Sequence, residues 1–324
     1  MFWKGNKMIF ADGHCDFLYG MANEGYDINS PVGRQSVSLE RLKAGGVKLQ
    51  FFAAWIDVRH RRGFLSQFMS MADAYERMLG SAPELVPLTP DFDPHGDKIA
   101  AVLTIEGGEA IEGYEDILRC VHRMGVKAMT LTWNTKNELG SPALKKDRKG
   151  LTFLGRNIVR EMGRIGMAVD VSHLNDAGIE DVLKEDVKVF ASHSNARAVF
   201  DSPRALCDEH IREIARRGGT VGVNFYHKQL TGKHRASVHD IALHALHILK
   251  VGGPGCLAIG SDFDGMGEYP PGLEDPSGLP LLAREMEREG VVGEALEAAC
   301  WGNLMRFAKG LCGPCASNGS ARFC

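Results

Sequence analysis

The chain has 324 residues and a formal net charge of -3, with 44% hydrophobic and 24% charged residues. This composition is typical of a soluble globular protein and gives no indication of a nucleic-acid or membrane-surface partner. No apolar stretch is long enough to span a bilayer, and the N-terminus has no apolar region followed by a small-residue cleavage site. The eight cysteines are scattered rather than spaced as a disulfide framework. We therefore expect reduced thiols and a cytoplasmic location.

Short β-rich runs alternate with longer amphipathic stretches along the chain. Strands are predicted at 8–14, 47–55, 99–106, 126–133, 167–173, 187–193, 220–226 and 256–262. Helices are predicted between and after them, at 64–80, 114–124, 153–165, 175–184, 207–217, 237–250, 277–289 and 293–309. Near-continuous apolar strands that alternate with helices favour a parallel sheet buried on both faces. A count of eight such strands favours an α/β fold closed into a (β/α)8 TIM-type barrel.

The predicted barrel forms a single domain at residues 1–309, with an extra C-terminal helix at 293–309. No Pro/Gly/Ser-rich linker interrupts residues 8–309, and the Pro- and Asp-rich segment 83–97 is expected to be a loop excursion. Residues 310–324 are expected to be a flexible tail. Cys312 and Cys315 in this tail form a C-x-x-C, but a redox motif of that kind follows a strand and opens a helix, whereas these cysteines follow the last helix.

The stretch MIFADGHCDF (8–17) places an imidazole and a carboxylate directly after an apolar run. On an extended chain, His14 and Asp16 leave the same face, because side chains at i and i+2 point the same way. Similar residue types end four other predicted strands: Glu106, His173, His193 and Asp262. In a (β/α)8 barrel the carboxyl ends of the strands meet at the face that carries the chemistry. We therefore expect these side chains to converge.

A single buried histidine is usually a hydrogen-bonded core residue, but this set also contains three carboxylates. Burying carboxylates without counter-charge is strongly unfavourable, whereas bound divalent cations neutralise them. Three histidines and two carboxylates exceed the three protein ligands of one catalytic zinc. Two ions that share Glu106 fit better, and they would hold a bridging hydroxide, because a metal lowers the pKa of bound water to about 7. The predicted reaction is metal-assisted hydrolysis of an amide-like bond.

The motifs together resemble the membrane dipeptidase (renal dipeptidase) family of the metal-dependent amidohydrolase superfamily. The matching stretches are DGHCD (12–16), IEGGEAI (105–111), LTWNTKNELG (131–140), DVSH (170–173), SHSNAR (192–197), VNFY (223–226), GSDFDG (260–265) and WGNLMR (301–306). They run in order over about residues 8–309, which is nearly the whole chain. Each motif alone is weak, and the ordered set is specific.

The resemblance implies a distorted (β/α)8 barrel that holds two zinc ions and hydrolyses dipeptides with a free carboxylate. It also implies a homodimer, and it leaves open a D-residue at the second position of the substrate. Carried over by motif, His14 and Asp16 would bind one zinc, His173 and His193 the other, and Glu106 would bridge them. The family role of Asp262 is to move the proton between the attacking water and the leaving amine.

Three further residues are expected to lie near the substrate. Arg204 in DSPRAL matches the family arginine that grips the substrate carboxylate, a task suited to a guanidinium fork. Without the family match, a solvated loop arginine is the plainer interpretation. Asn224 and Tyr226 lie at the end of the seventh predicted strand and are expected to line the pocket, although packing explains Tyr226 equally well.

Trp133 departs from the family pattern, because many members read LTHN where this chain reads LTWN. The histidine of those members contacts the substrate and helps to stabilise the tetrahedral intermediate, whereas an indole can donate only one hydrogen bond and cannot be cationic. Two alternatives to a dipeptidase therefore stay open. One is another amide or lactone hydrolase of the superfamily, acting for example on N-acyl-D-amino acids, and the other is a non-catalytic metal-binding barrel.

Overall fold

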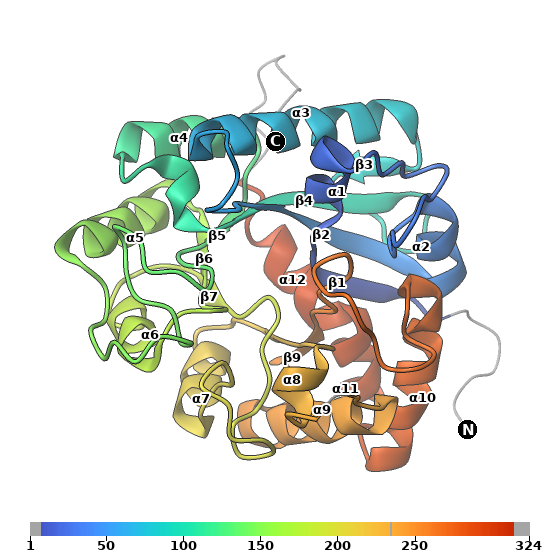
Figure 1. Ribbon diagram of the computed structural model, residues 1–324. Helices are drawn as coiled ribbons and strands as arrows, with labels where there is room; N and C mark the ends of the chain where they lie inside the picture. The colour runs from blue at the N-terminus through green and yellow to red at the C-terminus, as the bar shows by residue number, and fades with distance from the viewer. Residues whose placement is uncertain (1–7, 234, 314–324) are drawn as a thin grey trace.

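The computed structural model of the protein describes residues 8–233 and 235–313. Eight parallel strands form the wall of a barrel and are ordered β7-β6-β5-β4-β2-β1-β9-β8 (Figure 1). They are β1 (Phe10–Cys15), β2 (Val47–Trp55), β4 (Ile99–Glu106), β5 (Ala128–Thr130), β6 (Ala168–Asp170), β7 (Val189–Phe190), β8 (Val221–Val223) and β9 (Leu257–Ile259). A parallel bridge between Ala191 and Val221 joins the two ends of this order. The predicted (β/α)8 fold is confirmed.

Helices surround the barrel on its outside (Figure 1). They are α1 (Phe17–Asn23), α2 (Leu39–Gly45), α3 (Phe64–Ser81), α4 (Glu115–Arg123), α5 (Phe153–Ile165), α6 (Asp176–Val182), α7 (Asp208–Arg216), α8 (His227–Leu230), α9 (Val238–Gly252), α10 (Leu279–Glu289), α11 (Glu294–Glu297) and α12 (Asn303–Lys309). Short 3-10 turns lie at η1 (Gly108–Ile111) and η2 (Pro276–Gly278), and a π-helical turn at η3 (Ala298–Gly302). Among the described residues, no helix combines the length and apolarity needed to cross a membrane.

Two local features of the structure differ from the sequence predictions: a short strand within 83–97 and a division of the last predicted helix. The segment 83–97 was expected to be a loop, but it contains the short strand β3 (Leu85–Pro87), which pairs with β4 outside the ring. The helix expected at 293–309 is divided into α11, η3 and α12. In contrast, α5 matches its predicted range, because the Thr152 hydroxyl accepts a hydrogen bond from the Gly155 N–H and Gly166 ends the helix at φ 80°.

The interior of the barrel is apolar at one end. A cluster of inward side chains from the strands includes Ala11, Leu49, Phe51, Ala100, Val102, Ala128, Ala168, Phe190 and Ala258. Helix α12 closes this end, and the ring of Phe307 lies 4.8 Å from that of Phe190. Packing continues beyond the predicted domain end, because Leu311 is buried in the same cluster. The Cys315 half of the C-x-x-C lies outside the described residues.

The same inward register carries polar residues further along the strands. Ala100 and Val102 face the apolar interior, so Glu106 at the end of β4 points inward as well. Likewise, Ala168 is followed two residues later by Asp170, and Phe190 by Ser192. The strand alternation therefore fills one end of the barrel with apolar side chains and the carboxyl-terminal end with polar ones.

Candidate metal centre

The five predicted ligands meet at the carboxyl-terminal end of the barrel, and Glu106 lies at their centre. Its Oε1 is 3.0 Å from His173 Nε2 and 3.6 Å from His193 Nε2, and its Oε2 is 3.7 Å from His14 Nε2. Asp16 Oδ2 lies 3.6 Å from the same His14 nitrogen. All five side chains are buried. Each oxygen of Glu106 thus faces a different part of the cluster, which is the arrangement that a bridging carboxylate requires.

The protonation of His193 follows from its hydrogen-bond network. The Asp170 carboxylate accepts hydrogen bonds from the Ser172 and Ser192 N–H groups, both at 2.9 Å, and from the Thr130 hydroxyl at 2.7 Å. The Ser192 hydroxyl donates to Asp170 Oδ2 at 2.6 Å, because the carboxylate can only accept. Ser192 Oγ must then accept from His193 Nδ1, 2.7 Å away. His193 Nε2 therefore carries a free lone pair.

His173 is oriented in the same way by a residue from another loop. Its Nδ1 donates to Asn134 Oδ1 at 2.9 Å, which leaves its Nε2 unprotonated. The Nε2 atoms of His173 and His193 lie 2.9 Å apart. Burial, together with repulsion from Arg204 and His14, lowers the pKa of both imidazoles well below the ordinary value. Two neutral imidazoles thus direct lone pairs at each other, and a cation that accepts both pairs would relieve this repulsion.

The opposite side of the cluster is rich in negative charge. Burial disfavours the charged form of His14, but Glu106 and Asp16 outweigh this effect and raise the pKa of His14 well above its ordinary value. Burial raises the pKa of Glu106 to about 7. His14 Nε2 and Asp16 Oδ1 are buried and have no hydrogen-bond partner within the described part of the chain. Orphaned imidazole and carboxylate atoms that converge in this way form a donor set that fits divalent cations.

Asp262 stands beside His14 and Asp16, and the ligand atoms of the three residues lie within 4.8 Å of one another. Its Oδ2 accepts a hydrogen bond from Asn224 Nδ2 at 3.0 Å, and burial raises its pKa to about 6. A Cβ atom at Gly265 would come within 2.2 Å of Asp16 Oδ2 and 2.3 Å of Asp262 Oδ1. Glycine is therefore required where this loop approaches the two carboxylates.

Arg204 is buried next to the cluster, and its described hydrogen bonds go to uncharged acceptors. Its Nη1 donates to the Ser194 hydroxyl at 3.0 Å, and its Nη2 donates to the His193 carbonyl at 3.1 Å. Its Nε is buried without a partner among the described residues. Burial lowers the pKa of Arg204 to about 10, so the guanidinium stays charged at neutral pH. Asp170, Glu106 and Asp262 favour this charge from a distance, but none of the described carboxylates forms a salt bridge with it.

The remaining predicted residues occupy different environments. Trp133 is half-buried at the edge of the cluster, with its ring 6.3 Å from that of His173. Asn224 is fully buried and donates a hydrogen bond to Asp262, and its place in the pocket lining stays a prediction. The ring centroids of Tyr226 and His227 lie 4.8 Å apart, and the backbone N–H of Tyr226 donates to Asn224 Oδ1 at 2.6 Å. A substrate contact of Tyr226 stays a prediction.

Several supporting residues were not recognised in the sequence. Asp12, in the DGHCD motif, accepts hydrogen bonds from the Ser261 N–H at 2.8 Å and the Ser261 hydroxyl at 2.6 Å. Asp264 accepts hydrogen bonds from the N–H groups of Ser36 and Val37 at 2.5 and 3.1 Å. These bonds hold the loop that contains Ser36 and Val37 next to the site. The available signal was a carboxylate within or just after an apolar strand, as in Asp12 and in Asp170.

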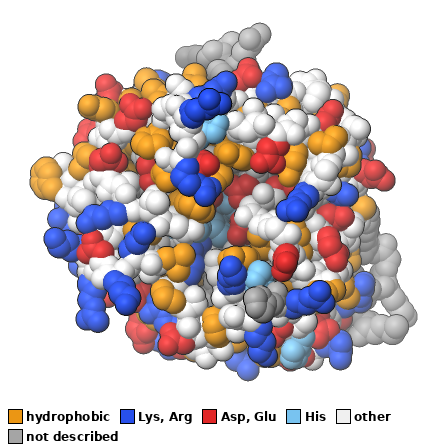
Figure 2. All heavy atoms as spheres, viewed as in Figure 1, with side chains coloured by type: hydrophobic (Ala, Val, Ile, Leu, Met, Phe, Trp, Pro, Cys, Tyr) orange, Lys and Arg blue, Asp and Glu red, His pale blue; other side chains and the backbone are white. Residues whose placement is uncertain are grey.

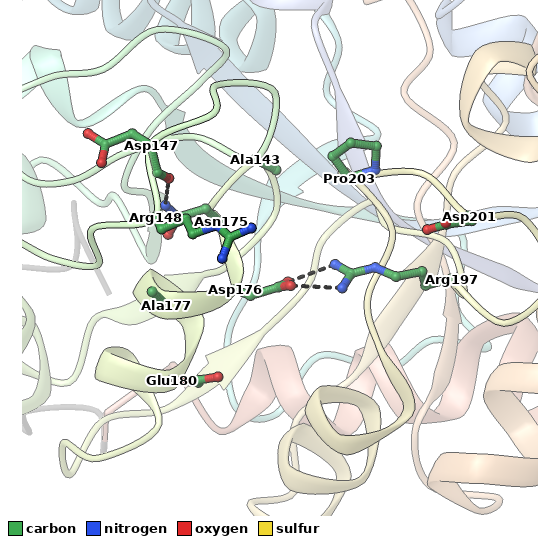
Figure 3. Close-up of a pocket in the computed structure, with 10 residues that line it drawn as sticks. All are labelled: Ala143, Asp147, Arg148, Asn175, Asp176, Ala177, Glu180, Arg197, Asp201 and Pro203. Atoms are coloured by element: carbon green, nitrogen blue, oxygen red, sulfur yellow. Dashed lines mark hydrogen bonds and ion pairs between the residues drawn. The ribbon is translucent and has the colours of Figure 1, made fainter.

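A hollow opens in the middle of the molecular face shown in Figure 2, where histidine and acidic side chains surface among hydrophobic ones. A separate cavity of about 480 Å³ is shown in Figure 3. It is lined by Ala143, Asp147, Arg148, Asn175, Asp176, Ala177, Glu180, Arg197, Asp201 and Pro203. Arg197 there donates to both oxygens of Asp176 at 2.7 Å. None of the five predicted ligands lines this cavity, so it is distinct from the cluster.

One further group of metal-ligand types lies on the surface. His239 Nδ1 is 3.3 Å from Glu285 Oε1 and 3.2 Å from Glu289 Oε1. His239 is half exposed, and Glu285 is also paired with Arg288. An ordinary ion-pair network between α9 and α10 accounts for this group.

Comparisons with known proteins agree with the geometry. The sequence profile of the family described as membrane dipeptidase (peptidase family M19) matches residues 5–311. The chain is 33% identical over 310 residues to dipeptidase 3 of Rattus norvegicus, covering 91% of this chain and 64% of that protein. It is 31% identical over 297 residues to an uncharacterized dipeptidase of Schizosaccharomyces pombe, covering 84% of this chain and 71% of that protein. The chain thus spans slightly less than two thirds of the dipeptidase 3 protein.

Two solved structures are similar over almost their whole length. One is a metallopeptidase from Rhodobacter sphaeroides bound to a phosphinate mimic of the dipeptide L-Ala-D-Ala, with a TM-score of 0.83, 26% identity, and coverage of 93% of this chain and 99% of that chain. The other is the metallopeptidase dipeptidase AC of family M19, with a TM-score of 0.84, 27% identity, and coverage of 93% and 98%.

Proposed function

The chain belongs to the membrane dipeptidase family, peptidase family M19, and we propose that it is a metal-dependent hydrolase that cleaves the peptide bond of dipeptides. One observation carries the proposal: two buried imidazoles bring their Nε2 atoms within 2.9 Å of each other, beside a central carboxylate. Such an arrangement is suited to hold cations. The relatives described as dipeptidases support the choice of substrate.

Two divalent cations, which we propose to be zinc, match the donor set. His14 and Asp16 would hold one, His173 and His193 the other, and Glu106 would contribute one oxygen to each. When bound, such ions polarise a carbonyl and lower the pKa of water to about 7. Because Asn134 and Ser192 fix the two imidazoles with Nε2 towards Glu106, these ligands need little reorganisation on binding.

Arg204 would select substrates with a free carboxylate. Its charge is not matched by any carboxylate within ion-pair distance in the described ranges, and its Nε has no partner there. The guanidinium is also hydrogen-bonded to the main chain of His193, one of the predicted ligands, so a carboxylate bound to it would lie close to the cluster. An anchor close to the cluster suits the C-terminal residue of a dipeptide.

Asp262 would carry the proton from the attacking water to the leaving amine. Asn224 donates a hydrogen bond to its Oδ2, and a carboxylate oxygen of Asp262 lies within 4.8 Å of the ligand atoms of His14 and Asp16. General acid–base assistance of this kind typically contributes about 10²–10⁴ in rate.

A D-residue at the second position is the proposed stereochemistry. The related Rhodobacter sphaeroides metallopeptidase binds a mimic of L-Ala-D-Ala, which supports this choice. A second candidate is hydrolysis of N-acyl-D-amino acids, and the apolar indole of Trp133 beside His173 favours it. The homodimer and the cytoplasmic location stay predictions.

The test is amine release from L-Ala-D-Ala, L-Ala-L-Ala and N-acetyl-D-Ala by zinc-reconstituted protein, with metal content measured and a chelator-treated control alongside. We expect zinc-dependent cleavage of L-Ala-D-Ala. Cleavage of N-acetyl-D-Ala alone would favour the second candidate. No cleavage by protein that holds two metals per chain would overturn the dipeptidase assignment.

A further inference from the structure

We propose that Tyr19, Trp55 and Trp133 form the surface that binds the side chain of the substrate's N-terminal residue, and that the enzyme prefers a large apolar residue there. We call these three side chains the aromatic wall. The inference rests on the proposed dipeptidase function and adds the substrate class that it favours.

The aromatic wall is continuous although its members come from distant parts of the sequence. The rings of Tyr19 and Trp55 lie 4.8 Å apart at an angle of 61°, and those of Trp55 and Trp133 lie 5.0 Å apart at 67°. These edge-to-face contacts are a favourable arrangement for aromatic pairs. All three side chains are partly exposed, so part of their surface is open to a ligand.

The aromatic wall borders the metal-ligand cluster directly. Trp133 lies 6.3 Å from His173 between ring centroids. Trp55 is the register partner of Glu106 in the β2–β4 pair. Leu49 and Phe51 of β2 face the barrel interior, so Trp55 points inward by the same two-residue repeat. A substrate carbonyl at the cluster is therefore within reach of these rings.

The strand order places Trp55 of the aromatic wall opposite the carboxylate anchor, whereas Trp133, which follows β5, is two places from β7. Around the ring β1-β2-β4-β5-β6-β7-β8-β9, the strands β2 and β7 lie four places apart in either direction. Trp55 ends β2, whereas Arg204 is bonded to His193 and Ser194, which follow β7. A dipeptide that spans the cluster with its carboxylate on Arg204 must direct its N-terminal residue across the barrel, towards the aromatic wall.

The chemistry of the aromatic wall favours apolar side chains. Its rings offer flat apolar surface. Each added methylene in an apolar subsite typically changes kcat/KM by about 10-fold or more. We therefore expect L-Phe-D-Ala and L-Leu-D-Ala to exceed L-Ala-D-Ala in kcat/KM by at least roughly 10-fold.

The experiment measures kcat/KM for L-Phe-D-Ala, L-Leu-D-Ala and L-Ala-D-Ala with the zinc-loaded full chain and its variants. In Trp133→Ala and Trp55→Ala, the Phe/Ala ratio should fall towards one, with the L-Ala-D-Ala value changed least. Trp133→Phe, which keeps an aromatic ring, should retain most of the preference. Trp301→Phe is the matched control, because this indole contacts His95 at the other end of the barrel, and the ratio should stay unchanged.

Two results separate the two levels of the proposal. If the wild-type protein cleaves the three dipeptides with equal efficiency, this inference is overturned while the dipeptidase function stands. If it cleaves none of them at full metal loading, the proposed function fails and this inference fails with it. An unchanged Phe/Ala ratio in both Ala variants, with metal content and Tm preserved, would also overturn the aromatic wall as the subsite.

Discussion

The two ends of the barrel are built from the same strands but serve opposite purposes. At the amino-terminal end, inward residues such as Ala100, Val102 and Phe190 pack against α12. A few residues further along the same strands, inward positions carry Glu106 and Ser192. Because alternate residues of a strand share one face, the register that packs the apolar end also turns Glu106 and Ser192 inward. The ligands His14, His173 and His193 lie an odd number of residues beyond the inward Ala11, Ala168 and Phe190, so the irregular strand ends place them. The two ends therefore differ in the residue types at the inward positions: these are apolar near the start of each strand, and several are polar near its end.

The largest expected effect comes from removing the centre of the polar end. Glu106→Gln leaves an amide that cannot supply a negative oxygen to each side of the cluster. Substitution of a residue that hydrogen-bonds to a metal ligand typically lowers activity by up to roughly 100-fold. Because Glu106 is itself a predicted ligand, activity should fall by more than this. Bound metal should fall below two ions per chain after dialysis, as measured by atomic absorption.

Glu109→Gln is the matched control for this variant. Glu109 is another buried carboxylate, three residues later, and its Oε1 accepts a hydrogen bond from Thr135 at 3.3 Å. Its loss should leave the metal content unchanged. If Glu106→Gln kept two metals and normal activity, the bridging role would be wrong.

Asp262→Asn should affect chemistry without emptying the site. We expect kcat to fall by about 10²–10⁴, because the amide can no longer accept the proton of the attacking water. Metal content should be retained, since the five ligands are untouched. Asp264→Asn, two residues later, loosens only the Ser36–Val37 loop and should lower kcat much less. Equal losses in the two variants would contradict a proton-carrying role for Asp262.

Phe307→Ala tests the apolar end. Truncation of this buried ring, which lies 4.8 Å from Phe190, should lower the free energy of unfolding by about 3–5 kcal/mol. Below its reduced Tm, the folded variant should retain its metal affinity and KM, because the cavity lies at the other end. Phe153→Ala is the control, since Phe153 is 75% exposed and its removal should change stability little. A fall in metal affinity in Phe307→Ala would show that the two ends are coupled.

Ser192→Ala lies between the two ends and should have the smallest of these effects. It removes the hydroxyl that links Asp170 to His193 Nδ1, so the imidazole loses the acceptor that fixes its tautomer. Metal affinity should fall by roughly 10- to 100-fold in a competition titration with a chelating dye. Ser237→Ala, which removes the N-cap of α9, should lower stability by about 1 kcal/mol without changing metal affinity. If Ser192→Ala and Ser237→Ala bound metal equally well, the Ser192 hydroxyl would have no role in orienting His193 for metal binding.

The sequence by itself determined the strand periodicity and the residue types at the strand ends. The predicted ranges 47–55 and 99–106 coincide with β2 and β4, because long apolar β-rich runs give a strong signal. The later strands were predicted at seven or eight residues, but in the structure they have two or three residues. The residues that converge at the cluster were recognised because each polar side chain follows an apolar strand.

The tertiary structure alone decided which residues face one another across the barrel. Periodicity places residues of one strand on a face, but it carries no information on the register between strands that are far apart in the sequence. The contacts of Ser192 with Asp170, of Asn134 with His173 and of Trp55 with Trp133 each join different strands or loops. These contacts orient the imidazoles and form the aromatic wall, and they arise only when the strands pair in the order β7-β6-β5-β4-β2.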